Sequence, residues 1–111
     1  MDPSQAARTS LLPALERIAR YHGQSGNEAL GFMDTSDELY LTWRSAMSGR
    51  ARFQALPADQ LAAVNEMDAL YERIVTKYHK LPPLPKFLAT EGGRELTKRA
   101  AELLAMLRAS V

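Results

Sequence analysis

The sequence predicts an all-α protein that folds as a single-domain bundle of four main helices. Apolar residues recur at helical spacing in four separate stretches, and capping residues, prolines and glycines bound each stretch. No pair of alternating segments suggests two strands that could form a hairpin. We expect the helices near residues 3–22, 36–48, 57–80 and 92–109, and we expect residues 1–111 to form one helical domain.

The first helix has recognisable signals at both of its expected ends. Asp2 is a favourable N-cap residue, and Pro3 suits the first helical position. Pro13 lies inside the apolar pattern, where it either kinks a long helix or belongs to the first turn of a helix capped by Ser10. Gly23 ends the segment. Along it, the residues that recur at helical spacing are Leu11, Leu15, Ile18, Ala19 and His22.

The second helix begins at a predicted capping box. Thr35 and Glu38 have the spacing at which the two residues bind each other's backbone N–H groups. The segment Leu39–Trp43 also alternates and is rich in β-forming residues, so a strand is the alternative there. We favour the helix, which Gly49 would terminate, because no partner strand is visible.

The third helix has the longest pattern. Pro57 suits its first helical position, and Pro82 and Pro83 would stop it and stiffen the connection that follows. Its buried face is expected to comprise Leu61, Val64, Met67, Tyr71, Ile74, Val75 and Tyr78. The fourth helix begins near Gly92, and its inward residues are Leu96, Ala100, Leu103, Leu104 and Leu107. A faint similarity between residues 16–22 and 72–79 suggests that the bundle consists of two helical hairpins.

Composition excludes several classes of protein. With 14 Lys and Arg against 13 Asp and Glu, the net charge of +1 provides no overall attraction to nucleic acid or to anionic lipid. The absence of cysteine excludes disulfide scaffolds, thiolate zinc sites and cysteine nucleophiles. No apolar run is long enough to span a membrane, and the first residues do not resemble a signal peptide. We therefore expect a cytoplasmic protein.

No motif in the chain indicates catalysis. His22 and His79 are the two histidines, and no carboxylates stand at the spacing of a zinc site. No serine lies in a nucleophile elbow, and no glycine-rich loop has the strand and the lysine that phosphate binding requires. We expect a non-catalytic protein without a metal or another cofactor.

Two groups of cations, each with an aromatic residue, are the candidate binding site. One group surrounds Gly49 and the other surrounds the proline-rich connection. We expect the stretches 44–53 and 77–87 to meet at one end of the bundle, where their aromatic rings and cations would bind a partner. The candidate residues are Trp43, Arg44, Arg50, Arg52, Phe53, Lys77, Lys80, Lys86 and Phe87.

These residues suggest a small protein-binding, adaptor or regulatory protein. Apolar residues such as Phe32 and Met33 lie in the connections, where they either cap the core or line a groove for a partner protein. The alternative is nucleic-acid binding, through the basic end or through a degenerate helix-turn-helix near residues 14–33. Gly26 and Gly31 would weaken the recognition helix of that motif. The sequence leaves homo-oligomerisation open.

Overall fold

A computed structural model describes residues 2–23 and 34–110 of the chain. Over these residues the fold is an all-α bundle without strands, which confirms the predicted class. In chain order the elements are α1 (Pro3–Ala19), α3 (Ser36–Met47), the 3₁₀ helix η1 (Arg50–Ala55), α4 (Ala58–Thr76), α5 (Leu84–Ala89) and α6 (Glu91–Ala109).

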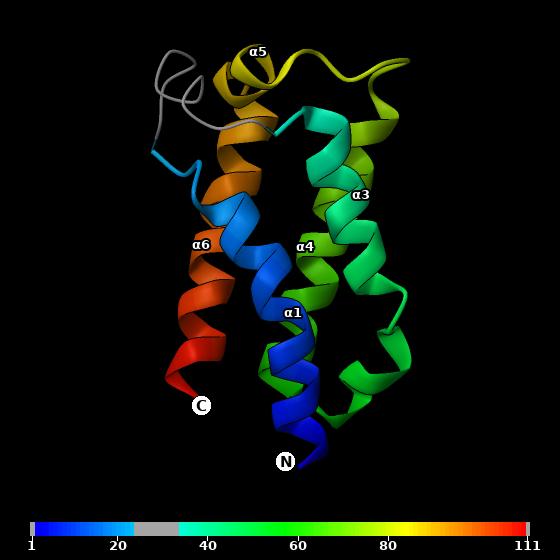
Figure 1. Cartoon of the computed structure of the whole chain (residues 1–111), viewed down its shortest axis with the longest axis vertical. Helices are drawn as coiled ribbons and strands as arrows, with labels where there is room; N and C mark the ends of the chain where they lie inside the picture. Colours follow the sequence, from blue (N-terminus) through cyan, green and yellow to red (C-terminus); the bar gives the residue numbers. More distant parts are fainter. Residues whose placement is uncertain (1, 24–33, 111) are drawn as a thin grey trace.

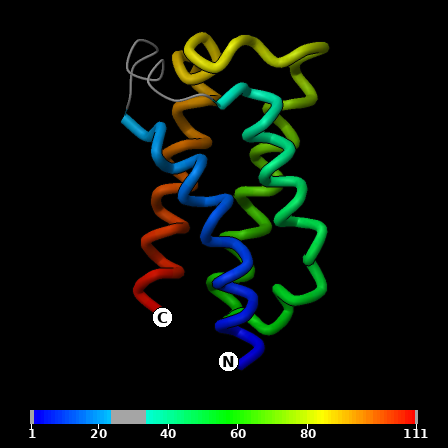
Figure 2. Tube along the Cα trace, in the orientation of Figure 1, coloured from blue at the N-terminus to red at the C-terminus, as the bar shows by residue number. Residues whose placement is uncertain are grey.

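The four long helices alternate in direction along the bundle. α1 and α4 run one way, and α3 and α6 run the other way (Figure 1). α1 packs against α3, α6 and η1, whereas α4 packs against α6. Two antiparallel pairs, α1 with α3 and α4 with α6, therefore follow each other along the chain, as two helical hairpins would (Figure 2).

The predicted capping residues begin the helices as expected. The Asp2 carboxylate accepts a hydrogen bond from the Gln5 backbone N–H at 2.8 Å. In α3 the Glu38 N–H donates to Thr35 Oγ1 at 3.0 Å, and the Thr35 N–H donates to Glu38 Oε1 at 3.3 Å, so the capping box is complete. Residues 39–43 are helical, and the strand alternative is therefore wrong.

The ends of the helices differ from the predictions in detail. α1 stops at Ala19, and a turn leads to Gly23. The φ of Gly23 is 79°, which lies in the left-handed region that glycine adopts more easily than other residues. α4 stops at Thr76 rather than at residue 80. Pro57 is the residue before α4 and not its first helical residue.

The connections contain two short helices that the sequence patterns did not predict. η1 follows Gly49, and α5 follows the prolines at positions 82 and 83. Proline is tolerated in the first turn of a helix because the N–H groups there have no helical partner. Pro85 therefore fits the first turn of α5, so this proline-rich stretch both ends α4 and begins α5.

Pro13 lies inside α1, which selects the long-helix alternative. A proline has no N–H to donate to the carbonyl four residues earlier, here that of Thr9. We expect Pro13→Ala to leave the free energy of unfolding unchanged or to raise it by up to about 1 kcal/mol, because the restored bond offsets the added freedom of the unfolded chain. Urea denaturation measures this change, and a loss above about 1 kcal/mol would contradict it.

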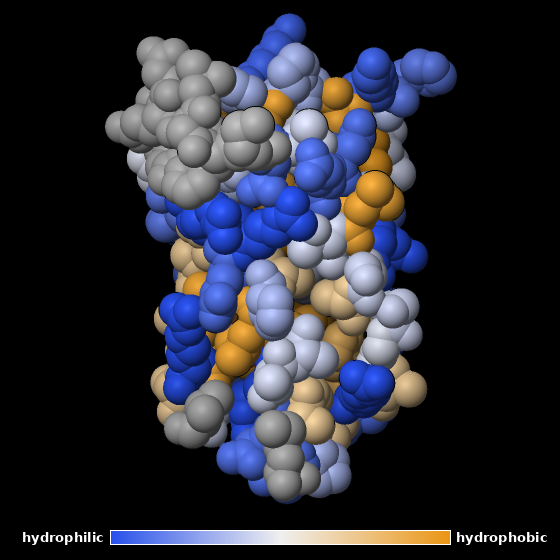
Figure 3. Space-filling view, in the orientation of Figure 1, coloured by the Kyte–Doolittle hydropathy of each residue, from blue (hydrophilic) through white to orange (hydrophobic). Residues whose placement is uncertain are grey.

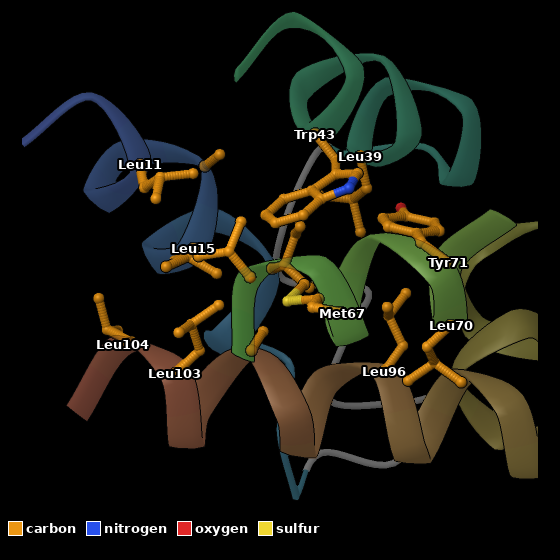
Figure 4. Packing of buried hydrophobic residues seen from close by; sticks show 14 of the residues in the cluster. Leu11, Leu15, Leu39, Trp43, Met67, Leu70, Tyr71, Leu96, Leu103 and Leu104 are labelled. Carbon is orange, nitrogen blue, oxygen red and sulfur yellow. The ribbon is translucent and has the colours of Figure 1, made fainter. Parts of the chain in front are cut away.

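One hydrophobic core joins the long helices and α5. Leu11 and Leu15 of α1 face Met67 of α4 and the leucines of α6, and Trp43 closes the core from α3 (Figure 4). The largest fully buried side chains are Trp43, Tyr21, Tyr71, Phe53, Phe87, Leu11, Leu15, Ile18, Leu39, Met67, Leu96 and Leu107.

Ile74 and Leu103 occupy the middles of their helix faces and are both 4% exposed. We expect Ile74→Ala and Leu103→Ala each to lower the free energy of unfolding by at least about 2 kcal/mol, because each substitution leaves a cavity in the core. Urea denaturation of the purified variants measures the loss. A loss below about 0.5 kcal/mol in both variants would contradict the assignment of these faces.

The start of α6 lies directly against α5. A Cβ atom placed on Gly93 would stand 2.1 Å from the carbonyl oxygen of Phe87, so the helix backbones meet where this residue has no side chain. The Gly93 backbone N–H donates to the hydroxyl of Thr90, the N-cap residue of α6, at 3.0 Å. Gly93 thus allows the sharp turn between the two helices.

Candidate functional site

The two basic stretches do not share one end of the bundle. Arg50 and Arg52 lie in η1, which precedes α4, whereas Lys77 is the residue that caps the other end of α4. The 19 residues of α4 separate these positions by about 28 Å. Figure 2 shows η1 and the connection after α4 at opposite ends of the molecule. The expected meeting of the stretches 44–53 and 77–87 is therefore wrong, because a straight helix keeps them apart.

Two of the candidate arginines bind carboxylates of α4. Arg44 Nη1 donates to Glu72 Oε1 at 3.1 Å, and Arg50 Nη2 donates to Asp68 Oδ2 at 2.9 Å. Asp68 also accepts a hydrogen bond from the indole N–H of Trp43 at 2.9 Å. These bonds explain why α4 tolerates two acidic residues one turn apart, since each carboxylate has its own cation.

The candidate aromatic residues belong to the core. Trp43 and Phe53 have no exposed surface, and Phe87 is 1% exposed. They cannot form a contact surface for a partner in this conformation, so they cap the core instead. Phe32 and Met33 lie outside the described residues, as does the second half of the degenerate helix-turn-helix at residues 14–33.

An open groove of about 720 Å³ lies between α1 and α3. Hydrophobic and hydrophilic side chains alternate across this face without one continuous apolar patch (Figure 3). Leu41 lines the groove and is 63% exposed. Among the described residues, Met106 is the one other large apolar side chain that is exposed. This α1–α3 groove is lined by Ser10, Pro13, Ala14, Arg17, Glu38, Leu41, Thr42, Ser45, Ala46, Ser48, Gly49 and Arg52.

Most hydroxyl groups of the groove are bonded to their own helices. Ser10 donates to the Ala7 carbonyl at 2.8 Å, Thr42 donates to the Glu38 carbonyl at 2.8 Å, and Ser48 donates to the Ser45 carbonyl at 2.6 Å. Covering such a hydroxyl leaves no donor without an acceptor. The groove is therefore easier to dehydrate than its composition suggests.

A partly buried polar cluster lies at one end of the groove. Asp34, just before α3, accepts hydrogen bonds from Arg17 Nε at 2.7 Å and from the Tyr21 hydroxyl at 2.5 Å. Arg17 also donates to Thr42 Oγ1 at 2.7 Å. Burial raises the pKa of the Asp34 carboxyl, but the hydrogen bonds from Tyr21 and Arg17 and the Arg17 charge outweigh it and hold that pKa below its ordinary 3.8.

We expect Asp34→Asn to lower the free energy of unfolding by about 1.5–3 kcal/mol at pH 7, because it removes the charge that Arg17 and Tyr21 bind. A pKa lowered by folding stabilises the fold above the ordinary value, and the stabilisation is lost as the pH falls through the folded-state pKa. The difference between the two proteins should thus be constant above about pH 5 and shrink below it. Urea denaturation between pH 7 and pH 3 measures this difference.

Asp37→Asn is the matched control for that experiment. Asp37 lies three residues further along, in the first turn of α3; it is exposed, and its side chain makes no hydrogen bond or ion pair with the described residues. Its substitution should therefore change stability by less than about 0.5 kcal/mol. Equal losses in the two variants would contradict the role given to Asp34.

Arg52 is the candidate cation that lies at the α1–α3 groove. It is exposed at the η1 end of the groove, and its side chain makes no ion pair or hydrogen bond with any described residue. Lys77, Lys80 and Lys86 are exposed at the far end of α4, away from this groove. The nine candidate residues thus divide into three core aromatic residues, two arginines bonded to α4, three distant lysines and one cation at the groove.

The sequence analysis did not select the groove, although one signal pointed to it. Leu41 is two residues from both Leu39 and Trp43, which are buried. Two residues correspond to about 200° around a helix, so a helix that buries Leu39 and Trp43 must expose Leu41. The other lining residues are small or polar and give no such signal.

No group of three or more histidine or acidic side chains within residues 2–23 and 34–110 could hold a metal ion. Across the same residues, no helix is both long enough and apolar enough to cross a bilayer. No known family model matches the chain, and neither a curated protein nor a solved structure is significantly similar to it.

Proposed function

We propose that this chain is a non-catalytic protein-binding module, with an adaptor or regulatory role, and that the α1–α3 groove is its binding site. The observation that supports this proposal is the exposed Leu41 in an open groove where three hydroxyl groups, those of Ser10, Thr42 and Ser48, already donate to backbone carbonyls. Burying such a leucine against a partner contributes about 1.5–3 kcal/mol, and covering the hydroxyls opposes this gain only weakly.

The distribution of cations favours a protein over nucleic acid as the partner. A surface that tracks a phosphate backbone needs several unpaired cations along one face. Here Arg44 and Arg50 are paired with carboxylates, and the lysines lie at the other end of α4. A single cation at the edge of a mixed groove is better suited to orienting an acidic protein partner.

The proposal is tested by placing a photo-crosslinking amino acid at Ser45 in the full chain, in cells that produce it. Ser45 lines the groove, is exposed and donates no side-chain hydrogen bond to a described residue. Ala62 is a matched control, because it is a small, exposed residue of α4 outside the groove. We expect a discrete protein adduct at position 45 that Leu41→Asp abolishes.

Three outcomes would contradict the proposal. Equal adducts at positions 45 and 62 would show non-specific contact, and the absence of any adduct at position 45 would show that nothing occupies the groove. An adduct that nuclease removes would favour the nucleic-acid alternative. In that case labelled DNA and RNA, titrated at two salt concentrations, should bind more weakly at the higher one.

A further inference from the structure

The shape of the α1–α3 groove restricts what can occupy it. Two antiparallel helices form its walls, and the lining residues of α3 and of the turn that follows it extend from Glu38 to Gly49, a length of about 16 Å or three helical turns. Small side chains form much of this surface: Ser10, Ala14, Ser45, Ala46 and Gly49. Small residues along a groove allow a third helix to approach the first two closely.

Hydrogen bonding distinguishes a helix from an extended peptide as the occupant. An extended segment brings backbone N–H and C=O groups that need partners when they are buried. The walls are helices, whose backbone groups are bonded internally, and the hydroxyls of Ser10, Thr42 and Ser48 already donate to those helices. A helix pairs its own backbone N–H and C=O groups. It is therefore the secondary structure that can bind in this groove without leaving buried backbone groups unpaired.

Charge gives the occupant a second property. At one end of the groove Arg17 is matched by Asp34 and Glu38. At the other end Arg52 has no ion pair with any residue that the structure describes. A carboxylate on the occupant would form an ion pair with Arg52, whereas a cation at the same position would be repelled by it.

We propose, on the basis of the proposed function, that the groove binds an amphipathic helix of a partner protein, about three turns long, with an acidic residue facing Arg52. Its apolar face covers Leu41 and the small residues of α1 and α3. The geometry is that of a third helix packed on an antiparallel pair, and it needs no rearrangement of the described helices.

Two peptide libraries of equal length test this inference against the full chain. One displays 16-residue helix-forming peptides that are randomised on one face, and the other displays 16-residue proline-rich peptides that are extended. We expect enrichment from the helical library, with Asp or Glu at the position that faces Arg52. Binding of the selected peptides is measured by fluorescence anisotropy, and their helicity on binding by circular dichroism.

Charge reversal tests the contact with Arg52. We expect Arg52→Glu to weaken a selected peptide at least tenfold, and a Lys in place of its acidic residue to restore the affinity. Arg73→Glu is the matched control, because Arg73 is exposed on α4, away from the groove, and should leave the affinity within about twofold.

The outcomes separate this inference from the proposed function. Enrichment from the extended library alone, with binding lost in Leu41→Asp, overturns the helix and keeps the groove as a protein-binding site. Enrichment from neither library overturns both. Binding that is equal in Arg52→Glu and Arg73→Glu overturns the acidic contact. Self-association of the chain in sedimentation, lost in Leu41→Asp, overturns the inference by making a second copy the occupant.

Discussion

Replacing Gly93 with alanine is expected to lower the free energy of unfolding by about 3 kcal/mol or more. The added methyl group would stand 2.1 Å from the Phe87 carbonyl oxygen and 2.9 Å from its carbonyl carbon, closer than any such atoms approach without movement. Both neighbours are backbone atoms, so no rotamer change relieves the overlap and α5 must move away from α6. Urea denaturation followed by circular dichroism measures the loss.

Gly92→Ala is the control for this substitution. Its Cβ atom would lie 3.2 Å from Ile74 Cγ1, which is a side-chain atom that can shift by a few tenths of an ångström. Alanine also favours the helix over glycine by about 1 kcal/mol. We expect Gly92→Ala to stay within about 1 kcal/mol of the natural protein. A Gly93→Ala variant that is equally stable would contradict the close approach of α5 and α6.

Trp43→Ala is expected to have the second large effect, a loss of about 3–5 kcal/mol from the cavity alone. The indole is fully buried, and its ring packs near Tyr71 with 6.5 Å between the ring centroids. The substitution also removes a donor from the buried Asp68 carboxylate, which adds to the loss. Because small domains are stable by about 5–15 kcal/mol, we expect a variant that is partly unfolded at 37 °C.

Trp43→Phe divides this loss into its two parts. Phenylalanine keeps most of the apolar volume but donates no hydrogen bond, so it should cost about 1–3 kcal/mol. Thermal unfolding followed by circular dichroism ranks the three proteins. If Trp43→Ala lost less than about 1 kcal/mol, the indole could not be a central element of the core.

The parts of the fold that the sequence predicts are those with local causes. Thr35 and Glu38 mark the start of α3 because a capping box needs only four consecutive residues. η1 and α5 are too short for helical periodicity to indicate them. They form because Phe53 and Phe87 are buried against residues that are distant in the sequence. No local sequence pattern predicts such contacts.

The candidate site was harder to predict for the same reason. Arg44 and Arg50 were selected as binding residues because the sequence does not show the carboxylates that they contact. These partners, Glu72 and Asp68, are 28 and 18 residues away in the sequence. The groove is likewise a product of tertiary structure, since its walls come from helices separated by residues outside the described part of the chain. Among its residues, Leu41 alone could have been inferred from helical geometry.

The bonds between α3 and α4 have a consequence for how uniquely the chain folds. Leucine and alanine faces pack almost equally well when one helix slides past another by a turn, but hydrogen-bonded pairs do not. A slide of α3 by one turn would take the Trp43 N–H from Asp68 and the Tyr40 hydroxyl from Glu72 together. Asp68 and Glu72 of α4 thus fix the alignment of α3 along α4. They disfavour alignments shifted by one turn that the hydrophobic core alone would allow.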